Sequence, residues 1–212
     1  MTSRLANLLA LADSRLPTGG HVHSGGVEEA IACGLVRDLA TLDAYLRRRI
    51  RSTGLVAGSI AAAVCGGALA PGEADAETDA RTPSPAGRAA SRAQGRGLLR
   101  LSKRVWPEHD WSVLGSRPHL AVASGEAARV CGMSDCEAAM VLVYTTMTGS
   151  AIAAQRLLAL DPADVAACTF ALSELCDRTA DLAATGLADL SDPVLDVVAQ
   201  AHLDRERPLF AS

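Results

Sequence analysis

Apolar side chains recur along this chain mainly at helical spacing. Near the N-terminus, one predicted helix face consists of Leu5, Leu8, Leu9 and Ala12, at i, i+3, i+4 and i+7. Similar patterns predict helices over residues 27–33, 35–52, 55–69, 120–130 and 135–158. Glycine and proline interrupt the pattern between residues 14 and 26, where we expect a loop.

Three helix starts carry local signals. Ser134 and Glu137 form an S-x-x-E capping box before a long apolar run, so the helix over residues 135–158 is predicted to be central and buried. Asp161-Pro162 and Asp192-Pro193 each combine an N-cap residue with proline at the first helical position. The first pair predicts one helix ending at Gly186, with the apolar face Val165, Thr169, Leu172, Leu175, Cys176, Thr179 and Leu182. The second predicts a helix with the apolar face Val194, Val197, Val198 and Ala201.

Residues 71–87, PGEADAETDARTPSPAG, differ from the segments on either side. They include three prolines and four acidic residues, with almost no large apolar side chain. Such a composition cannot bury much apolar surface, so it predicts an exposed loop between helices.

The composition favours an all-α protein. Of the 212 residues, 49% are apolar but only 3% are aromatic, and alanine, leucine and valine supply most of the apolar content. Alanine and leucine are strong helix formers, whereas strands are usually richer in aromatic and β-branched residues. We expect a single-domain helical bundle of about eight to ten helices over residues 1–212. An exposed loop near 71–87 and a C-terminal tail, residues 203–212, complete this expectation.

Charge and cysteine content limit the function classes. The net charge of −4 argues against general attraction to nucleic acid. The six cysteines include no CxxC pair and are expected to be buried thiols of a reducing, cytoplasmic compartment. The apolar part of the N-terminus is too short for a signal peptide. The longest uncharged run, Ala138–Ala154, is short for a membrane span, and a buried helix is the expected alternative.

Five arginines follow one another at a spacing of four: Arg88, Arg92, Arg96, Arg100 and Arg104. On a helix they form one slowly drifting stripe, and no acidic residue occurs between Arg81 and Pro107. Two interpretations remain open at this stage, a solvated face and a contact surface for an acidic partner. Nucleic-acid binding is a further alternative, disfavoured because few aromatic residues lie nearby to stack on bases.

No set of residues of catalytic quality is evident. His21 and His23 are suitable zinc or nickel ligands, but they supply only two, and a metal carrier using them remains an alternative. Ser24 is not part of a G-x-S-x-G elbow, and no phosphate-binding P-loop is present. His109 beside Asp110 is weak evidence for acid–base chemistry, because adjacent side chains diverge. These observations favour a binding or scaffold protein.

The segment LLALADSRLPTGGHVHSGGVEEAI resembles the N-terminal signature of the urease accessory protein UreF family. The matching positions are Leu9, Leu11, Asp13, Ser14, Pro17, Gly19, Gly20, His23, Ser24, Gly26 and Glu28. Residues 91–101, the run ending in Arg156-Leu157 and the tail with His202, Leu209, Phe210 and Ser212 extend the resemblance over most of the chain. The chain departs from the family pattern at His21, usually aromatic, at residues 159–162, and at Leu203 and Pro208.

The resemblance implies an all-α, dimerising adaptor with no reaction, cofactor or metal site of its own. It implies partners as well: a UreD/UreH-type accessory protein, the GTPase UreG and apo-urease, into which nickel is inserted while GTP is hydrolysed. No nucleic-acid or membrane partner is expected. The expected contact residues are Pro17, Gly19, Gly20, His23, Ser24, Gly26, Glu28, Tyr144, Arg156, His202, Leu209 and Phe210. For the stretch 17–28, a fixed structural loop is an equal alternative to a partner surface.

Overall fold

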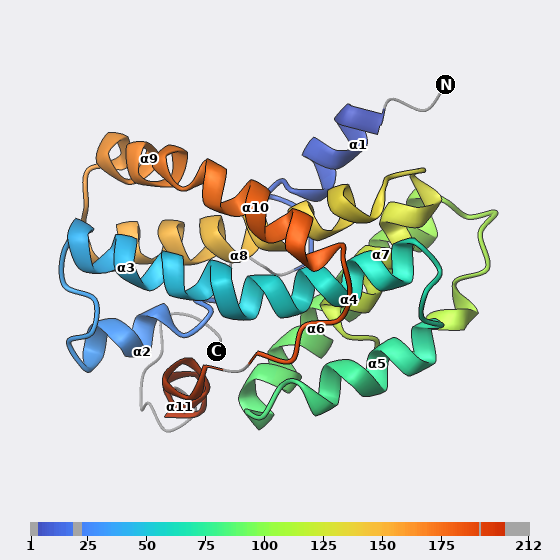
Figure 1. Ribbon diagram of the computed structural model, residues 1–212, viewed down its shortest axis with the longest axis horizontal. Helices are drawn as coiled ribbons and strands as arrows, with labels where there is room; N and C mark the ends of the chain where they lie inside the picture. The colour runs from blue at the N-terminus through green and yellow to red at the C-terminus, as the bar shows by residue number, and fades with distance from the viewer. Residues whose placement is uncertain (1–3, 19–22, 191, 202–212) are drawn as a thin grey trace.

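The computed structural model describes residues 4–18, 23–190 and 192–201, which fold as one helical bundle (Figure 1). The helices are α1 (Arg4–Leu11), α2 (Val27–Ala32), α3 (Leu39–Arg49), α4 (Leu55–Cys65), α5 (Pro71–Ala80), α6 (Pro85–Val105), α7 (Leu120–Val130), α8 (Asp135–Leu158), α9 (Pro162–Ala171), α10 (Ser173–Ala183) and α11 (Pro193–Ala201). The other helical elements are a π-helical segment, Ile50–Gly54, and a 3-10 turn, Trp111–Leu114. The expected all-α, single-domain fold is confirmed.

Helix α8 is the central element. It runs through the molecule beside α4, α7 and α10, and α3, the π-helical segment and α4 form one continuous rod alongside it (Figure 1). Small residues let these helices approach closely: a Cβ at Gly58 would lie 3.3 Å from Ala139 O, and one at Gly125 only 2.5 Å from Ala61 O. Close packing of small side chains explains how a chain with so few aromatic residues forms a dense core.

The predicted helix starts are confirmed. Glu137 Oε2 accepts a hydrogen bond from Ser134 N at 2.7 Å, and Ser134 Oγ accepts one from Glu137 N at 3.3 Å. Asp161 Oδ1 accepts from Ala163 N at 2.7 Å, with Pro162 in the first turn. Each cap satisfies backbone N–H groups that the helix itself leaves unpaired.

Residues 71–87 are not the exposed loop that their composition predicts. They form α5, a short connection over residues 81–84 and the first turn of α6, with Pro71 and Pro85 each in a first helical turn. Ala74 and Thr78 are buried against the rest of the bundle, and the Thr78 hydroxyl donates to Ala74 O at 2.7 Å. The prediction was wrong because small side chains suffice to bury one face of this helix.

The helix predicted from Asp161 to Gly186 is divided. Leu172 ends α9 and precedes α10. Most of the predicted apolar face is buried, namely Val165, Leu172, Leu175, Cys176 and Thr179, whereas Leu182 is 56% exposed. In α11 the buried residues are Leu195 and Val198, while Val197, predicted to face the core, is 67% exposed.

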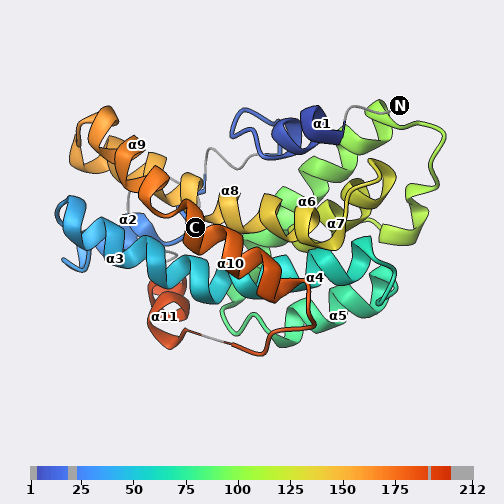
Figure 2. The same ribbon diagram turned by 45° about the horizontal axis from the view of Figure 1, so that its top comes forward.

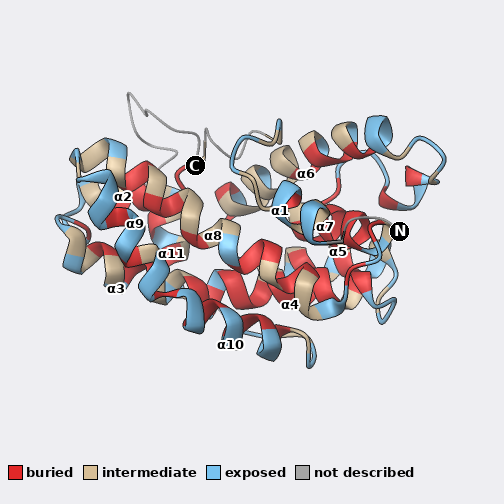
Figure 3. Ribbon diagram, turned by 90° about the horizontal axis from the view of Figure 1, so that it is seen from above, coloured by how far each residue is buried: buried red, intermediate tan, exposed pale blue. Residues whose placement is uncertain are grey.

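Burial is concentrated along α4, α7 and α8 (Figure 3). Helix α8 is long and apolar enough to span a membrane by length and composition, but half of its most apolar window is buried in the bundle. A core helix gives the same pattern. All six cysteines are free thiols, as predicted, and Cys65, Cys131, Cys168 and Cys176 are buried. Cys33 is exposed, contrary to the expectation of a buried thiol.

Candidate functional site

We term residues 17–28 the signature loop. Side chains of α3 and α8 hold its end in place, at the turn around Gly25 and Gly26. Arg49 Nη1 donates to Gly25 O at 2.5 Å, and the Tyr45 hydroxyl donates to the same oxygen at 3.1 Å. The Ser150 hydroxyl, on α8, lies 3.5 Å from Ser24 O. The backbone carbonyls of this turn therefore have partners inside the molecule, as buried carbonyls require.

Two glycines in this turn are required by its backbone. Gly25 and Gly26 have φ values of 60° and 85°, in the left-handed region that side chains disfavour. A Cβ at Gly25 would lie 2.9 Å from Arg49 Nη2. One at Gly26 would lie 3.3 Å from Tyr45 Oη and 3.4 Å from Val198 Cγ1, on α11. The turn thus brings α3 and α11 to a common point.

The expected contact residues of the loop occupy different environments. Ser24, Gly26 and Glu28 are buried, His23 is half-buried and Pro17 is exposed. Gly19, Gly20 and His21 lie outside the described residues, so the pairing of His21 with His23 as metal ligands stays a prediction. The burial of Ser24, Gly26 and Glu28 favours the structural interpretation for these three positions.

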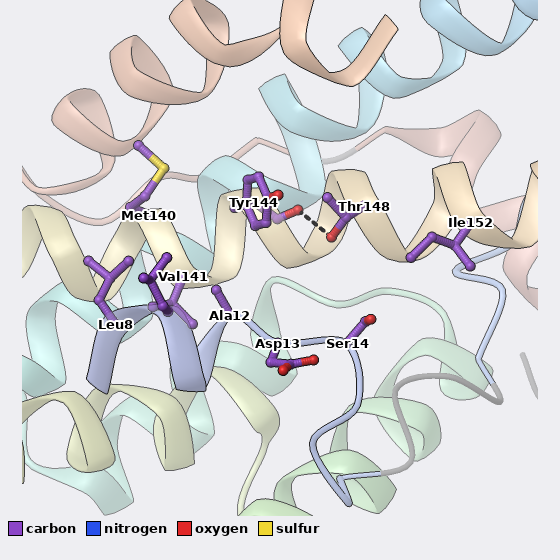
Figure 4. A pocket seen from close by; sticks show the side chains of 10 residues that line it. Leu8, Ala12, Asp13, Ser14, Met140, Val141, Tyr144, Thr148 and Ile152 are labelled. Atoms are coloured by element: carbon purple, nitrogen blue, oxygen red, sulfur yellow. Dashed lines mark hydrogen bonds between the residues drawn. The ribbon is translucent and has the colours of Figure 1, made fainter. Parts of the chain in front are cut away.

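An apolar groove of about 520 Å³ separates α1 from α8 (Figure 4). Its lining comes from both helices and the turn after α1: Leu8, Leu9, Ala12, Asp13, Ser14, Met140, Val141, Tyr144, Thr148 and Ile152. Tyr144 is 43% exposed, and Leu5 and Leu9 on α1 are 68% and 61% exposed. A grouping of large exposed apolar side chains around a groove is typical of an interaction surface.

Two expected contact residues lie on α8. Tyr144 is in the groove, whereas Arg156 is exposed in the last turn of the helix, twelve residues further along. At the helical rise per residue, their Cα atoms are about 18 Å apart. The two residues therefore cannot belong to one small site, although one partner of ordinary interface size could contact both.

Helix α11 leads directly into the tail. Arg48 forms an ion pair with Asp192, which also caps α11 by accepting from Val194 N at 3.2 Å. Gln200 Oε1 accepts from Ala86 N at 3.3 Å, which ties α11 to α6. The helix lies on the opposite side of the bundle from α1 (Figure 2). His202, Leu209 and Phe210 lie outside the described residues.

One group among the described residues has metal-ligand chemistry: Asp75, Asp79 and His119. Arg92 Nη2 lies 2.8 Å from Asp75 Oδ2 and 2.7 Å from Asp79 Oδ2, so one guanidinium forms ion pairs with both carboxylates. Burial opposes the ionised form of Asp79, but hydrogen bonds from His119 and Arg92 outweigh it and lower its pKa. These ion pairs and hydrogen bonds join α5, α6 and the start of α7.

His109 contacts an acid that the sequence did not reveal. Its Nε2 lies 2.8 Å from Glu126 Oε1, on α7, and its ring meets Trp111 edge-on at 4.6 Å. Glu126 is only 2% exposed and also accepts from Arg129 Nε at 3.0 Å. Burial favours the neutral form of Glu126, but the bonds from Arg129 and His109 prevail and lower its pKa. The neighbouring Asp110 caps the turn at Trp111 instead, accepting from Ser112 N.

Comparisons with known proteins bear on identity. A family model, UreF, matches residues 36–173, more than half of the chain. The chain belongs to the UreF family. Among similar curated proteins, the urease accessory protein UreF of Mycolicibacterium vanbaalenii is 72% identical over 213 residues, covering 99% of this chain and 100% of that protein. The Mycobacterium marinum protein of the same name is 69% identical over 208 residues, covering 98% and 99%. The Mycobacterium bovis protein is 65% identical over 212 residues and covers both chains fully, including the signature loop.

The UreF resemblance seen in the sequence is therefore confirmed over the whole chain. Sequence reasoning missed Tyr45 and Arg49, which hold the signature turn, and Met140, which lines the groove. Tyr45 and Arg49 are 20 and 24 residues from Gly25, and no local pattern marks a contact over that separation.

Proposed function

We propose that this UreF family member is a non-enzymatic cytoplasmic adaptor for nickel insertion into apo-urease. In this role it bridges a UreD/UreH-type accessory protein and the GTPase UreG, and it couples GTP hydrolysis to nickel delivery. Full-length similarity to proteins named urease accessory protein UreF carries the proposal.

The groove between α1 and α8 supports a homodimer in this proposal. A two-fold contact needs a surface that is complementary to itself. Here the groove around Tyr144 is lined in part by the exposed Leu9, and the exposed Leu5 lies one helical turn before it on α1. In a two-fold dimer, the α1 side chains of each copy fill the groove of the other.

The remaining contacts are assigned to other partners. The exposed Pro17 and Arg156, the half-buried His23 and the tail residues His202, Leu209 and Phe210 are proposed to meet the accessory protein and the GTPase. Helix α11, which precedes the tail in the sequence, lies on the side of the bundle opposite α1.

Co-expression with the other urease accessory proteins of the same organism tests the function. We expect a defined complex that contains the UreD/UreH-type protein and recruits the GTPase, sized by light scattering. A chain that joins neither protein would overturn the adaptor function.

The dimer is tested on the isolated chain. Light scattering should give twice the chain mass of 21.9 kDa. Tyr144→Asp, which places a charge in the apolar groove, should give a single chain mass with unchanged helical circular dichroism. Val113→Asp, at a side chain 48% exposed in the 3-10 turn, is the matched control and should stay dimeric. A dimeric Tyr144→Asp variant would place the contact elsewhere.

A further inference from the structure

The arginine series along α6 divides into two functional parts. Arg88 and Arg92 are used inside the molecule: Arg88 Nη1 donates to Thr82 O at 2.6 Å, and Arg92 binds Asp75 and Asp79. The second part, Arg96, Arg100 and Arg104, is exposed. Lys103 is exposed beside it, and we term these four residues the basic face of α6. None of the four forms an ion pair with an acid in the part of the chain that the structure describes.

The four cations occupy one side of the helix. At about 100° per residue they fall within an arc of about 100°. The opposite side is buried and consists of Gly95, Leu98, Leu99 and Ser102. The basic face is therefore held outward by the packing of α6 and does not depend on flexible segments.

This arrangement is unfavourable for the isolated chain. Arg96 and Arg100, and Arg100 and Arg104, are like-charge pairs at i, i+4, which destabilise a helix. Only the last-turn residues Lys103 and Arg104 gain from the helix dipole. The chain has more acidic than basic residues, 24 against 20, yet none lies between Arg81 and Pro107 to relieve the repulsion.

We propose that the basic face of α6 is a docking surface for an acidic segment of a partner protein. Carboxylates of the partner would pair with the guanidinium groups of Arg96, Arg100 and Arg104 and remove their mutual repulsion. Guanidinium groups suit this role because they bind carboxylates bidentately. The proposal rests on the adaptor function, since the partner is sought among the proteins of that assembly.

The surroundings favour a protein over a polyanion or a membrane. No aromatic residue lies among the four cations, and only the half-buried Trp106 follows them closely, so bases have little to stack on. The exposed arc carries no apolar side chain to enter a bilayer. The net charge of −4 repels a long polyanion more strongly than it repels a short acidic segment.

Association kinetics test the proposal. Arg96→Glu/Arg100→Glu is compared with the wild type for binding to the UreD/UreH-type protein, the GTPase and apo-urease, at low and high salt. Charge steering acts mainly on association, so we expect the association rate constant for one partner to fall about 10-fold or more at low salt, with little change in dissociation. The wild-type rate should fall with added salt, and the variant rate should be nearly insensitive to it.

Arg37→Glu/Arg51→Glu is the control, because it makes the same change in net charge at exposed arginines without ion pairs among the described residues. It should leave the association rate within about 2-fold of the wild type. Circular dichroism checks that both variants fold.

Three outcomes would overturn the basic-face proposal. If the wild type binds a partner and Arg96→Glu/Arg100→Glu associates with that partner equally fast, the basic-face proposal is wrong and the adaptor function is unaffected. A wild type that binds none of the three proteins removes the adaptor function and the docking surface together. If the variant loses binding to a labelled single-stranded oligonucleotide but keeps its protein partners, the face binds nucleic acid.

Discussion

Arg49 Nη1 lies 2.5 Å from Gly25 O, which fixes the end of the N-terminal signature to the last turn of α3. Loss of a hydrogen bond from a charged donor costs about 1.5–3 kcal/mol, so Arg49→Met should lower the free energy of unfolding by that amount. Urea denaturation measures the change. Arg51→Met, at an exposed arginine two residues away, should change it by less than about 0.5 kcal/mol. If both substitutions lower the free energy of unfolding equally, the hydrogen bond to Gly25 O contributes nothing to stability.

A second prediction separates backbone strain from contact with α11. Gly26 and Gly34 have similar φ values, 85° and 76°, so alanine strains the backbone at both by about 1–2 kcal/mol. A Cβ at Gly34 meets nothing within 4 Å, whereas one at Gly26 reaches Tyr45 and Val198. Gly26→Ala should therefore be the more destabilising, and it alone should speed hydrogen exchange in α11. Unchanged exchange in α11 would contradict the proposed link between the turn and that helix.

A third prediction concerns pH. His119 is fully buried, with Nδ1 3.0 Å from Ser91 Oγ and Nε2 2.9 Å from Asp79 Oδ1. Burial lowers the pKa of His119 below its ordinary value of 6.5, although Asp79 partly opposes the shift. Below pH 6.5 the unfolded chain therefore binds a proton that the folded protein does not. The free energy of unfolding decreases as the pH is lowered, until the folded protein also binds that proton.

The corresponding measurement is the free energy of unfolding between pH 7 and pH 5. The His119 contribution to its slope can reach about 1.4 kcal/mol per pH unit. His119→Gln keeps a polar side chain but removes the titration, so its slope should be smaller than that of the wild type. Parallel curves would mean that His119 titrates alike in the folded and unfolded states.

A fourth prediction addresses the tail. Deletion of residues 203–212 should weaken binding to the UreD/UreH-type partner, because it removes Leu209 and Phe210. The helical circular dichroism should be unchanged. A pull-down with the shortened chain measures the effect, and full binding would exclude the tail as a contact.

The sequence predicts those parts of the fold that depend on neighbouring residues. The caps at Ser134 and Asp161 are local hydrogen-bonding devices, and both are present as predicted. The position of α5 could not be predicted in this way. Its buried face depends on Ala74 and Thr78 meeting other helices, a contact that composition does not indicate.

The candidate surfaces show the same division. Tyr144 was correctly placed on α8, but the groove beside it requires α1 to lie across that helix. The stripe of arginines was evident from spacing alone. Its division was not, because the acids that bind Arg92 lie on α5, a segment predicted to be a loop.

The common contact of Gly26 with α3 and α11 affects how genetic data on this chain should be read. A screen for lost partner binding would score substitutions in the N-terminal signature as if they marked an epitope. Many would act at a distance, by tilting the helix from which the C-terminal tail departs. Suppressor mutations of such variants should therefore map to α11 or Tyr45 within this chain, and not to a binding partner.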